Sequence, residues 1–217
     1  MRRARKSRRA DARAVFPAPN REFRADTATW EQVKSRNVVM QKFEYTCGAA
    51  SLATIFRYCY DDPIEETEIL AAAFKNLTDK EVADREKNGL SMEDLSRGAA
   101  KFKYAAAVLE LKYDKMRALP VPVVVRTIKD DFKHFVVFHG ESDGYVYLAD
   151  PIRGNVRMPH AEFLKRWDGK VLAVVKRGAK PPKTHPLQIP PDADPVPQAQ
   201  TARRGLLEAP LTPLFHQ

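Results

Sequence analysis

Cysteine is scarce in this chain, with only Cys47 and Cys59 among 217 residues. Both fall on one predicted helix, so their Cα atoms would lie about 18 Å apart, far beyond the reach of a disulfide. No Cys-x-x-Cys or His-Glu-x-x-His pattern occurs, and two cysteines do not make the usual structural zinc site. The sequence therefore predicts no internal disulfide, no metal ion and no other cofactor.

Long apolar runs are missing as well. No stretch approaches the roughly 18 residues that a membrane-spanning helix requires. The N-terminus is basic but lacks the apolar core of a signal peptide. The sequence as written therefore predicts a cytoplasmic location, and a periplasmic or envelope-associated one if the start is misassigned.

Charge of one sign is missing from the body of the chain, although the whole chain carries +9. Residues 27–176 hold 23 Lys or Arg against 22 Asp or Glu, whereas residues 1–26 hold nine against three. A nucleic-acid-binding domain would carry its basic surface in the folded body, so no specific nucleic-acid partner is expected. For the basic N-terminal segment a solvated tail is favoured over weak contact with an anionic membrane surface.

Composition divides the chain into three parts. Residues 1–29 are basic and lack periodicity, which predicts a disordered tail. Residues 178–217 hold nine of the sixteen prolines and are predicted to form an extended, proline-rich tail. One compact domain is expected between them, over residues 30–177.

Helical patterns fill the first half of this domain and strand patterns the second. Helices first, followed by a mostly antiparallel sheet, predict an α+β fold. Asp143-Gly144 is a hairpin-turn signal. The predicted helices cover residues 47–60, a segment beginning near 63, 80–88, 92–102 and 159–167, and the predicted strands cover 105–113, 121–128, 134–139, 145–150 and 171–176.

Cys47 is the candidate nucleophile because it opens the first long predicted helix. Unpaired backbone N–H groups and the positive end of the helix dipole favour the thiolate there. Gly48 is expected to leave room for a substrate backbone beside the sulfur. A single helical cysteine is more often a buried structural residue, and we assign that role to Cys59, which lacks both features.

Two histidines compete for the role of general base. Alternation along the predicted strand places His134 on one face and His139 on the other, so only one of them can face the helix of Cys47. His134 begins the strand beside a loop, where active-site edges are common, and is preferred. Asp150 ends the next strand and would orient the imidazole, although a plain turn before Pro151 has the same appearance. Gln41, six residues before Cys47, would donate a side-chain N–H to an oxyanion, with a surface glutamine as the alternative.

Cys, His and Asp in this order, on three different elements, indicate a cysteine-nucleophile enzyme. A further short motif, which begins at Gly89, lies between Cys47 and His134. The segments that carry the pattern are Gln41-x5-Cys47-Gly-Ala-Ala-Ser-Leu-Ala, Gly89-Leu-Ser-Met-x2-Leu95, His134-Phe-Val-Val and Asp150-Pro151.

Together these segments resemble the bacteriocin-processing, double-glycine-leader cysteine peptidases over about residues 36–176. The resemblance implies a papain-like fold with Cys47 as nucleophile, His134 as base and acid, Asp150 as orienting residue and Gln41 in the oxyanion hole. No Walker-type loop or membrane segment follows, so the chain is similar to stand-alone members, including those of functional-amyloid secretion operons.

The function expected from this resemblance is a cysteine endopeptidase that cleaves a protein or leader peptide after small residues or Gly, in bacterial export or maturation. Its partners would be the peptide or protein substrate and a secretion system. Two alternatives stay open at this point. One is a non-catalytic peptide-binding module that assists secretion, and the other is a Cys-His-Asp acyltransferase or amidase.

Overall fold

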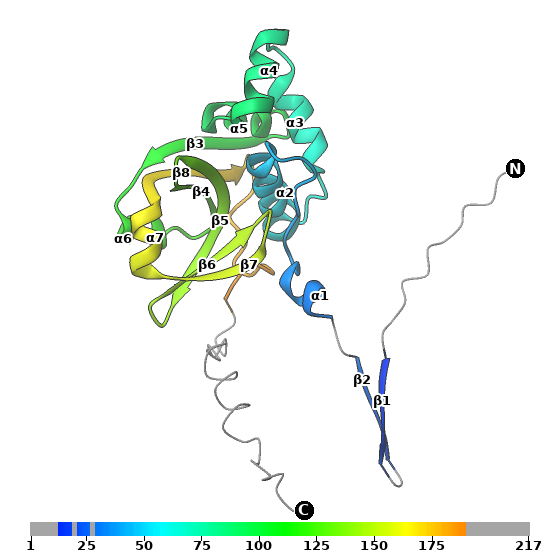
Figure 1. Cartoon of the computed structure of the whole chain (residues 1–217). Helices are drawn as coiled ribbons and strands as arrows, with labels where there is room; N and C mark the ends of the chain where they lie inside the picture. Colours follow the sequence, from blue (N-terminus) through cyan, green and yellow to red (C-terminus); the bar gives the residue numbers. More distant parts are fainter. Residues whose placement is uncertain (1–12, 19–20, 27–28, 190–217) are drawn as a thin grey trace, which may run out of the picture.

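A six-stranded antiparallel sheet forms the centre of the molecule. We describe the protein from a computed structural model, which defines residues 13–18, 21–26 and 29–189. Figure 1 shows the sheet curving around its own core, with helices at both of its faces. In spatial order the strands are β3 (Tyr104–Glu110), β8 (Trp167–Lys176), β4 (Val123–Lys129), β5 (Phe132–Ser142), β6 (Tyr145–Asp150) and β7 (Gly154–Pro159).

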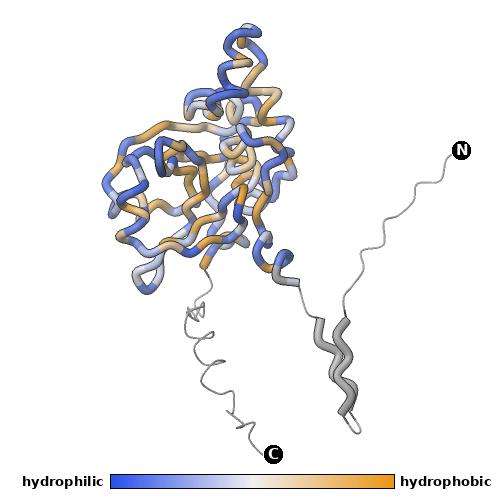
Figure 2. The backbone as a smooth tube through the Cα atoms, viewed as in Figure 1, coloured by the Kyte–Doolittle hydropathy of each residue, from blue (hydrophilic) through white to orange (hydrophobic). Residues whose placement is uncertain are grey.

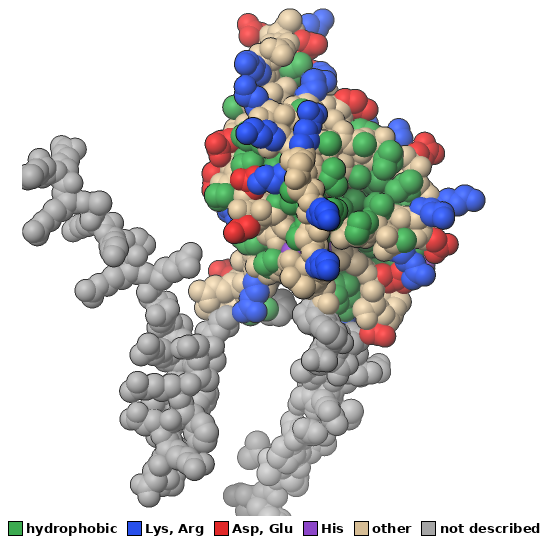
Figure 3. Space-filling view, turned by 180° about the vertical axis from the view of Figure 1, so that it is seen from behind, with side chains coloured by type: hydrophobic (Ala, Val, Ile, Leu, Met, Phe, Trp, Pro, Cys, Tyr) green, Lys and Arg blue, Asp and Glu red, His purple; other side chains and the backbone are tan. Residues whose placement is uncertain are grey.

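Five of the described helices precede this sheet along the chain. Helix α2 (Cys47–Tyr60) packs against β5, and α3 (Glu66–Phe74) and α5 (Met92–Lys101) pack against each other beside it. Helix α4 (Asp79–Asn88) has no buried residue, and its charged side chains cover the part of the molecule that projects at the top of Figure 3. The remaining helices are short: α1 (Trp30–Lys34), α6 (Tyr113–Arg117) and α7 (His160–Arg166).

The sheet separates two hydrophobic cores, as the alternation of side chains along its strands requires. Phe135 and Val137 of β5 join the larger core, which α2 fills. Val136 and Phe138, which alternate with them, join the smaller core around Phe163 of α7. Hydrophobic segments accordingly run through the sheet and α2 in Figure 2, while α4 is hydrophilic.

Gly48 allows α2 to approach the sheet closely. A Cβ atom there would lie 2.7 Å from a Leu95 side-chain carbon and 3.2 Å from a Phe135 carbon. The space beside Gly48 is therefore filled by the core. The expectation that Gly48 leaves room for a substrate backbone is wrong, because its lack of a side chain serves packing.

The α+β arrangement matches the sequence prediction, with differences in individual elements. Strand β7 was not predicted, and it pairs along its whole length with β6, from Tyr145–Pro159 to Asp150–Gly154. The predicted strand over 105–113 ends at Glu110, because α6 begins at Tyr113. The hairpin turn at Asp143-Gly144 is confirmed, and both residues have positive φ, 51° and 75°.

The two tails differ from their predicted forms where the structure describes them. Strands β1 (Arg13–Ala18) and β2 (Arg21–Asp26) pair as an antiparallel hairpin inside the segment 1–29, which was predicted to be disordered. The proline-rich segment is not free over residues 178–189, since Leu187 is only 3% exposed and Asn37 donates a hydrogen bond to the Pro186 carbonyl. Residues 1–12, 19–20, 27–28 and 190–217, which belong to the two predicted tails, lie outside the described residues.

Within the described parts of the chain, no helix is long and apolar enough to cross a membrane.

Candidate active site

Cys47 is the first residue of α2, as the sequence predicts, and it is 6% exposed. The preceding residue, Thr46, makes no side-chain hydrogen bond to the helix, and the first turn contains no acidic residue. The positive end of the α2 dipole therefore acts on Cys47 without a capping side chain to reduce it. A helix start of this kind is one of the positions at which reactive cysteines are found.

His134 lies near the start of β5 and is 8% exposed. Its Nε2 lies 2.9 Å from Oδ1 of Asp150. Its other ring nitrogen, Nδ1, is buried and has no hydrogen-bond partner among the described residues. Burial would lower the pKa of His134, but the hydrogen bond to Asp150 and the nearby Cys47 thiol outweigh it and raise the pKa to about 9. The imidazole is thus placed to hold a proton between a carboxylate and a thiol.

Asp150 ends β6 and is fully buried. Its Oδ1 also accepts the backbone N–H groups of Ile152 and Arg153, at 2.8 and 3.1 Å, and Nε of Arg153 donates to Oδ2 at 2.6 Å. Burial would raise the pKa of Asp150, but hydrogen bonds from His134 and Arg153 hold it well below its usual range. The carboxylate therefore stays charged and fixed, and favours the His134 tautomer that carries its proton on Nε2.

Gln41 lies next to this site, because its backbone N–H donates to the Pro151 carbonyl at 2.9 Å. Its side-chain amide is turned into its own loop, where Nε2 donates to the carbonyls of Phe43 at 2.8 Å and Glu44 at 3.3 Å. The amide oxygen is buried and has no partner among the described residues. Since both described donor contacts of the amide go to the loop, a role for Gln41 in an oxyanion hole stays a prediction.

A groove of about 370 Å³ opens beside Cys47. It runs between the loop before α2, the end of α4 and the turn that precedes His134. Phe43 and Phe132, 49% and 58% exposed, flank the site residues in the sequence and add apolar surface near the groove. The groove is lined by Glu44, Tyr45, Cys47, Glu86, Lys87, Asn88, Gly89, Asp131, Phe132 and Lys133.

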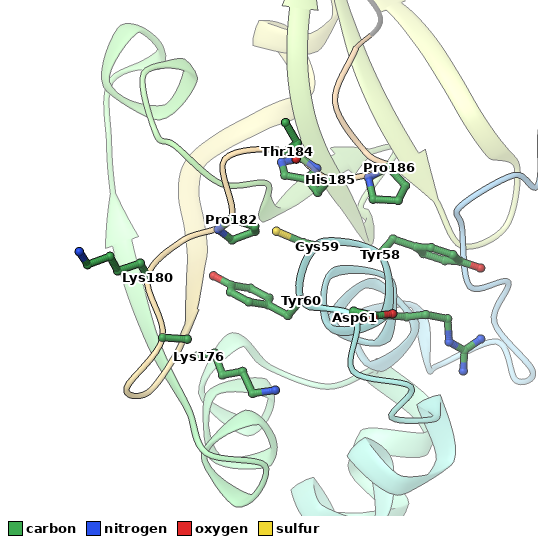
Figure 4. Close-up of a pocket in the computed structure, with 12 residues that line it drawn as sticks. Tyr58, Cys59, Tyr60, Asp61, Lys176, Lys180, Pro182, Thr184, His185 and Pro186 are labelled. Carbon is green, nitrogen blue, oxygen red and sulfur yellow. The ribbon is translucent and has the colours of Figure 1, made fainter.

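The second cysteine lies away from this site. Cys59 is at the opposite end of α2 and is 5% exposed, as expected for a core residue. Burial raises the pKa of its thiol to about 12. In Figure 4 it borders a cavity of about 560 Å³ that also includes His185 and Pro186.

The second histidine of β5 is also separated from Cys47. His139 falls where the β5–β6 register shifts, between Phe138 and Gly140, and borders a pocket with Tyr147 and Leu187. Neither of its ring nitrogens has a hydrogen-bond partner among the described residues, and burial lowers its pKa to about 4. The structure therefore brings together Cys47, His134 and Asp150 and leaves His139 out.

Sequence reasoning missed two charged residues at the site. Arg153 pairs with Asp150 three positions earlier, and this spacing after an Asp-Pro turn is the only signal in the sequence. Glu66 is fully buried and accepts the backbone N–H of Lys42 and the hydroxyl of Thr46. Nothing in the acidic run at the start of α3 marks which of its glutamates is buried. No three His, Cys, Asp or Glu side chains among the described residues are grouped to hold a metal ion.

A helix that begins with cysteine, packed on an antiparallel sheet that presents a histidine and an aspartate, defines a papain-like cysteine peptidase. The Peptidase C39 family model matches residues 35–179, which is most of the described structure. The chain belongs to the peptidase C39 family.

Two relatives share about a third of their aligned residues with this chain. The "Probable functional amyloid protease FapD" of Pseudomonas fluorescens is 33% identical over 151 residues, which cover 68% of this chain and 66% of that protein. The protein of the same name from Pseudomonas aeruginosa is 32% identical over 156 residues, covering 72% and 67%. The chain thus spans about two thirds of the length of these relatives.

Solved structures confirm the fold. The peptidase domain of Streptococcus ComA, described as a bi-functional ABC transporter of a quorum-sensing pathway, superposes with a TM-score of 0.56. It is 19% identical, and the match covers 64% of this chain and 98% of that domain. A double glycine motif protease from an AMS/PCAT transporter, in complex with its leader peptide, gives a TM-score of 0.52 at 25% identity, with coverages of 63% and 89%.

Proposed function

We propose that this protein is a cysteine endopeptidase that cleaves another protein or a leader peptide during bacterial export. The observation that carries this proposal is the 2.9 Å contact between His134 and Asp150, made beside Cys47 at the uncapped start of α2. Two relatives named as functional amyloid proteases and a structure solved with a leader peptide support the same kind of substrate.

The proposed reaction follows from the placement of the protons. His134 donates Nε2–H to Asp150, so its Nδ1 is the nitrogen that accepts the Cys47 proton. The sulfur then attacks the carbonyl carbon of the scissile bond, and the backbone N–H of Cys47 donates to the oxyanion. His134 returns its proton to the leaving amine, and a water molecule releases the acyl group by the same route.

We propose that Gln41 supplies a second donor to the oxyanion. A short loop separates Gln41 from Cys47. The hydrogen bonds that Nε2 of Gln41 donates to the Phe43 and Glu44 carbonyls would have to be exchanged for one to the substrate. Substrate entering the groove beside Glu44 is the event that would drive this exchange. Cleavage after small residues or Gly is proposed by likeness to the double glycine motif protease.

A peptide library prepared from a bacterial proteome tests this proposal. The full chain is incubated with the library, and new peptide ends are identified by mass spectrometry. We expect the wild type and Cys59→Ala to produce the same set of ends, with Cys47→Ala and His134→Ala producing none. If peptides bind to the wild type but no new end appears, the protein is a binding module and the endopeptidase proposal is wrong. Transfer of acyl groups to added amines without peptide hydrolysis would indicate an acyltransferase.

A further inference from the structure

Glu66 is a buried carboxylate that the proposed mechanism does not use. It is the first residue of α3 and has no exposed surface. Among the described residues it has no ion-pair partner, and the nearby Lys42 ammonium lies 3.8 Å from the neighbouring Glu65 instead. Burying an unpaired charge is costly unless hydrogen bonds replace the lost water. The hydrogen bonds to the Glu66 carboxylate must therefore offset the cost of burying it.

The hydrogen bonds of Glu66 all go to the loop between Gln41 and Cys47. The backbone N–H of Lys42 donates to both carboxylate oxygens, at 3.1 Å each. The hydroxyl of Thr46, which is also fully buried, has two acceptors within reach, Oε1 of Glu66 and the Phe43 carbonyl at 2.9 Å. The positive end of α3 adds to the stabilisation of the charge. Through Glu66, helix α3 thus holds both ends of the loop that precedes Cys47.

Thr46 is the residue through which this hold acts on α2. Threonine is a favoured N-cap residue, whose oxygen usually accepts an N–H of the first helical turn. Here it makes no such bond, and its φ and ψ of −102° and 11° are outside the extended region usual for a cap. Among the described residues no acceptor bonds the N–H groups of Cys47, Gly48 or Ala49. The start of α2 therefore stays open to a ligand.

We propose that Glu66 is a positioning residue, which holds Thr46 and Lys42 so that the N–H groups at the start of α2 remain free for the oxyanion. This inference rests on the proposed peptidase function. It predicts that Glu66 supports the steps that create an oxyanion and not the reactivity of the sulfur. The two can be measured separately, because only some reagents develop an oxyanion when they react.

Two probes make this separation. The aldehyde of acetyl-Gly-Gly accepts the Cys47 sulfur at its carbonyl carbon, and the oxygen takes up the proton from His134, giving a hemithioacetal that uses the oxyanion donors. Iodoacetamide forms an S–C bond as iodide leaves, so it needs no oxyanion donor. The variants are Glu66→Gln, which keeps the shape of the side chain, and Glu65→Gln, which makes the same change at the exposed neighbour.

We expect Glu66→Gln to weaken aldehyde binding about 10- to 100-fold, while iodoacetamide labelling of Cys47 stays within about twofold. The kcat for any peptide that the wild type cleaves should fall by a similar factor with little change in KM. Glu65→Gln should match the wild type in all three measurements. Equal losses in labelling and aldehyde binding, or no loss in either, would overturn the positioning role.

Thr46 provides a second pair of variants if Glu66→Gln does not fold. Thr46→Ser keeps the hydroxyl that bonds to Glu66, whereas Thr46→Val removes it and keeps the shape. We expect weaker aldehyde binding in Thr46→Val only, with Thr46→Ser close to the wild type. Equal aldehyde affinity in the two variants would contradict the proposal. If the wild type binds no aldehyde although Cys47 is labelled, the proposed function fails, and the role of Glu66 fails with it.

Discussion

The two ends of helix α2 contain similar residues in different surroundings. At its start, Cys47 lies beside His134, whose pKa rises to about 9. At its other end, Cys59 borders a cavity with His185, whose pKa burial lowers. His139, on the same strand as His134, has its pKa lowered to about 4 by burial. One buried carboxylate, Asp150, bonds to His134 at the first end, and no described carboxylate bonds to either histidine at the other.

The comparison shows that a cysteine and a histidine do not make a nucleophilic site by residue type alone. Burial by itself favours the neutral forms, and it raises the pKa of Cys59 to about 12. The hydrogen bond to Asp150 and the nearby Cys47 thiol reverse that preference at His134. The two ends of α2 therefore place a cysteine and a histidine in different electrostatic surroundings, and we propose that only Cys47 and His134 form a reactive pair.

The largest expected difference between the two ends is in peptide cleavage. Cys47→Ala should reduce the cleavage rate by about 10³-fold or more, because it removes the nucleophile. Cys59→Ala should leave the rate within about twofold, since its thiol has no part in the reaction. Rates of release of a peptide identified from the library, measured for both variants, check this. Equal losses would remove the distinction between the ends.

Removing the charge of Asp150 should leave the Cys47 end of α2 without a carboxylate bonded to its histidine, as at the Cys59 end. Asp150→Asn is expected to lower kcat by about 10²- to 10⁴-fold, because the His134 tautomer and its imidazolium lose their partner. Asp143→Asn, in the exposed hairpin turn, is the matched control and should have no effect. Steady-state kinetics on the same peptide measure both. A wild-type kcat in Asp150→Asn would mean that the carboxylate only closes a turn.

The two histidines of β5 should give opposite pH dependences of stability. In the unfolded chain both titrate near the ordinary value of about 6.5. The pKa of His134 is raised, so its stabilisation is complete below about 6.5 and is lost as the pH rises through about 9. The pKa of His139 is lowered, so its stabilisation is complete above about 6.5 and is lost as the pH falls through about 4.

Each histidine accounts for about 3 kcal/mol at most. Urea unfolding from acid to alkaline pH, in the wild type and in each His→Gln variant, measures these contributions. His134→Gln should flatten the alkaline side of the stability curve, and His139→Gln the acid side. A variant that lowers stability equally at every pH would show that its histidine contributes packing alone.

The smallest expected effect concerns residues 178–189, the segment that lies beside the Cys59 end of α2. Leu187 is 3% exposed within this segment, so Leu187→Ala should reduce the free energy of unfolding by about 2 kcal/mol. The cleavage rate should be unchanged at a temperature where the variant is folded, because the segment is at the opposite end from Cys47. Urea unfolding and the peptide assay check the two halves of this prediction. A large loss of activity without a loss of stability would show that the two ends are coupled.

Sequence patterns predicted the elements that carry the site better than the contacts within it. The bounds of α2 and β6 agree with the predicted ranges, because a buried helix and a short alternating strand have strong local signals. Strand β7 was missed because Gly154–Pro159 has few β-branched residues and becomes a strand only by pairing with β6.

The structure places His134, and not His139, beside Asp150, but alternation alone would not have decided between the two histidines. Phe135 and Val137, which alternate with His134, are the residues that pack in the core with α2. His134 reaches Cys47 because it lies near the end of the strand, where the register with β6 also places Asp150. Glu66 could not have been found, since its burial depends on how α3 meets a loop twenty residues earlier.

The pH dependence of iodoacetamide labelling at each cysteine is the most direct test of the proposed Cys47–His134 pair. Mass spectrometry would follow both sites in the wild type and in His134→Ala. A Cys47 thiolate paired with the His134 imidazolium predicts that Cys47 is labelled at about pH 6 while Cys59 is not, and that His134→Ala abolishes this advantage. Equal labelling of the two cysteines in the wild type, or an advantage of Cys47 that does not depend on His134, would contradict it.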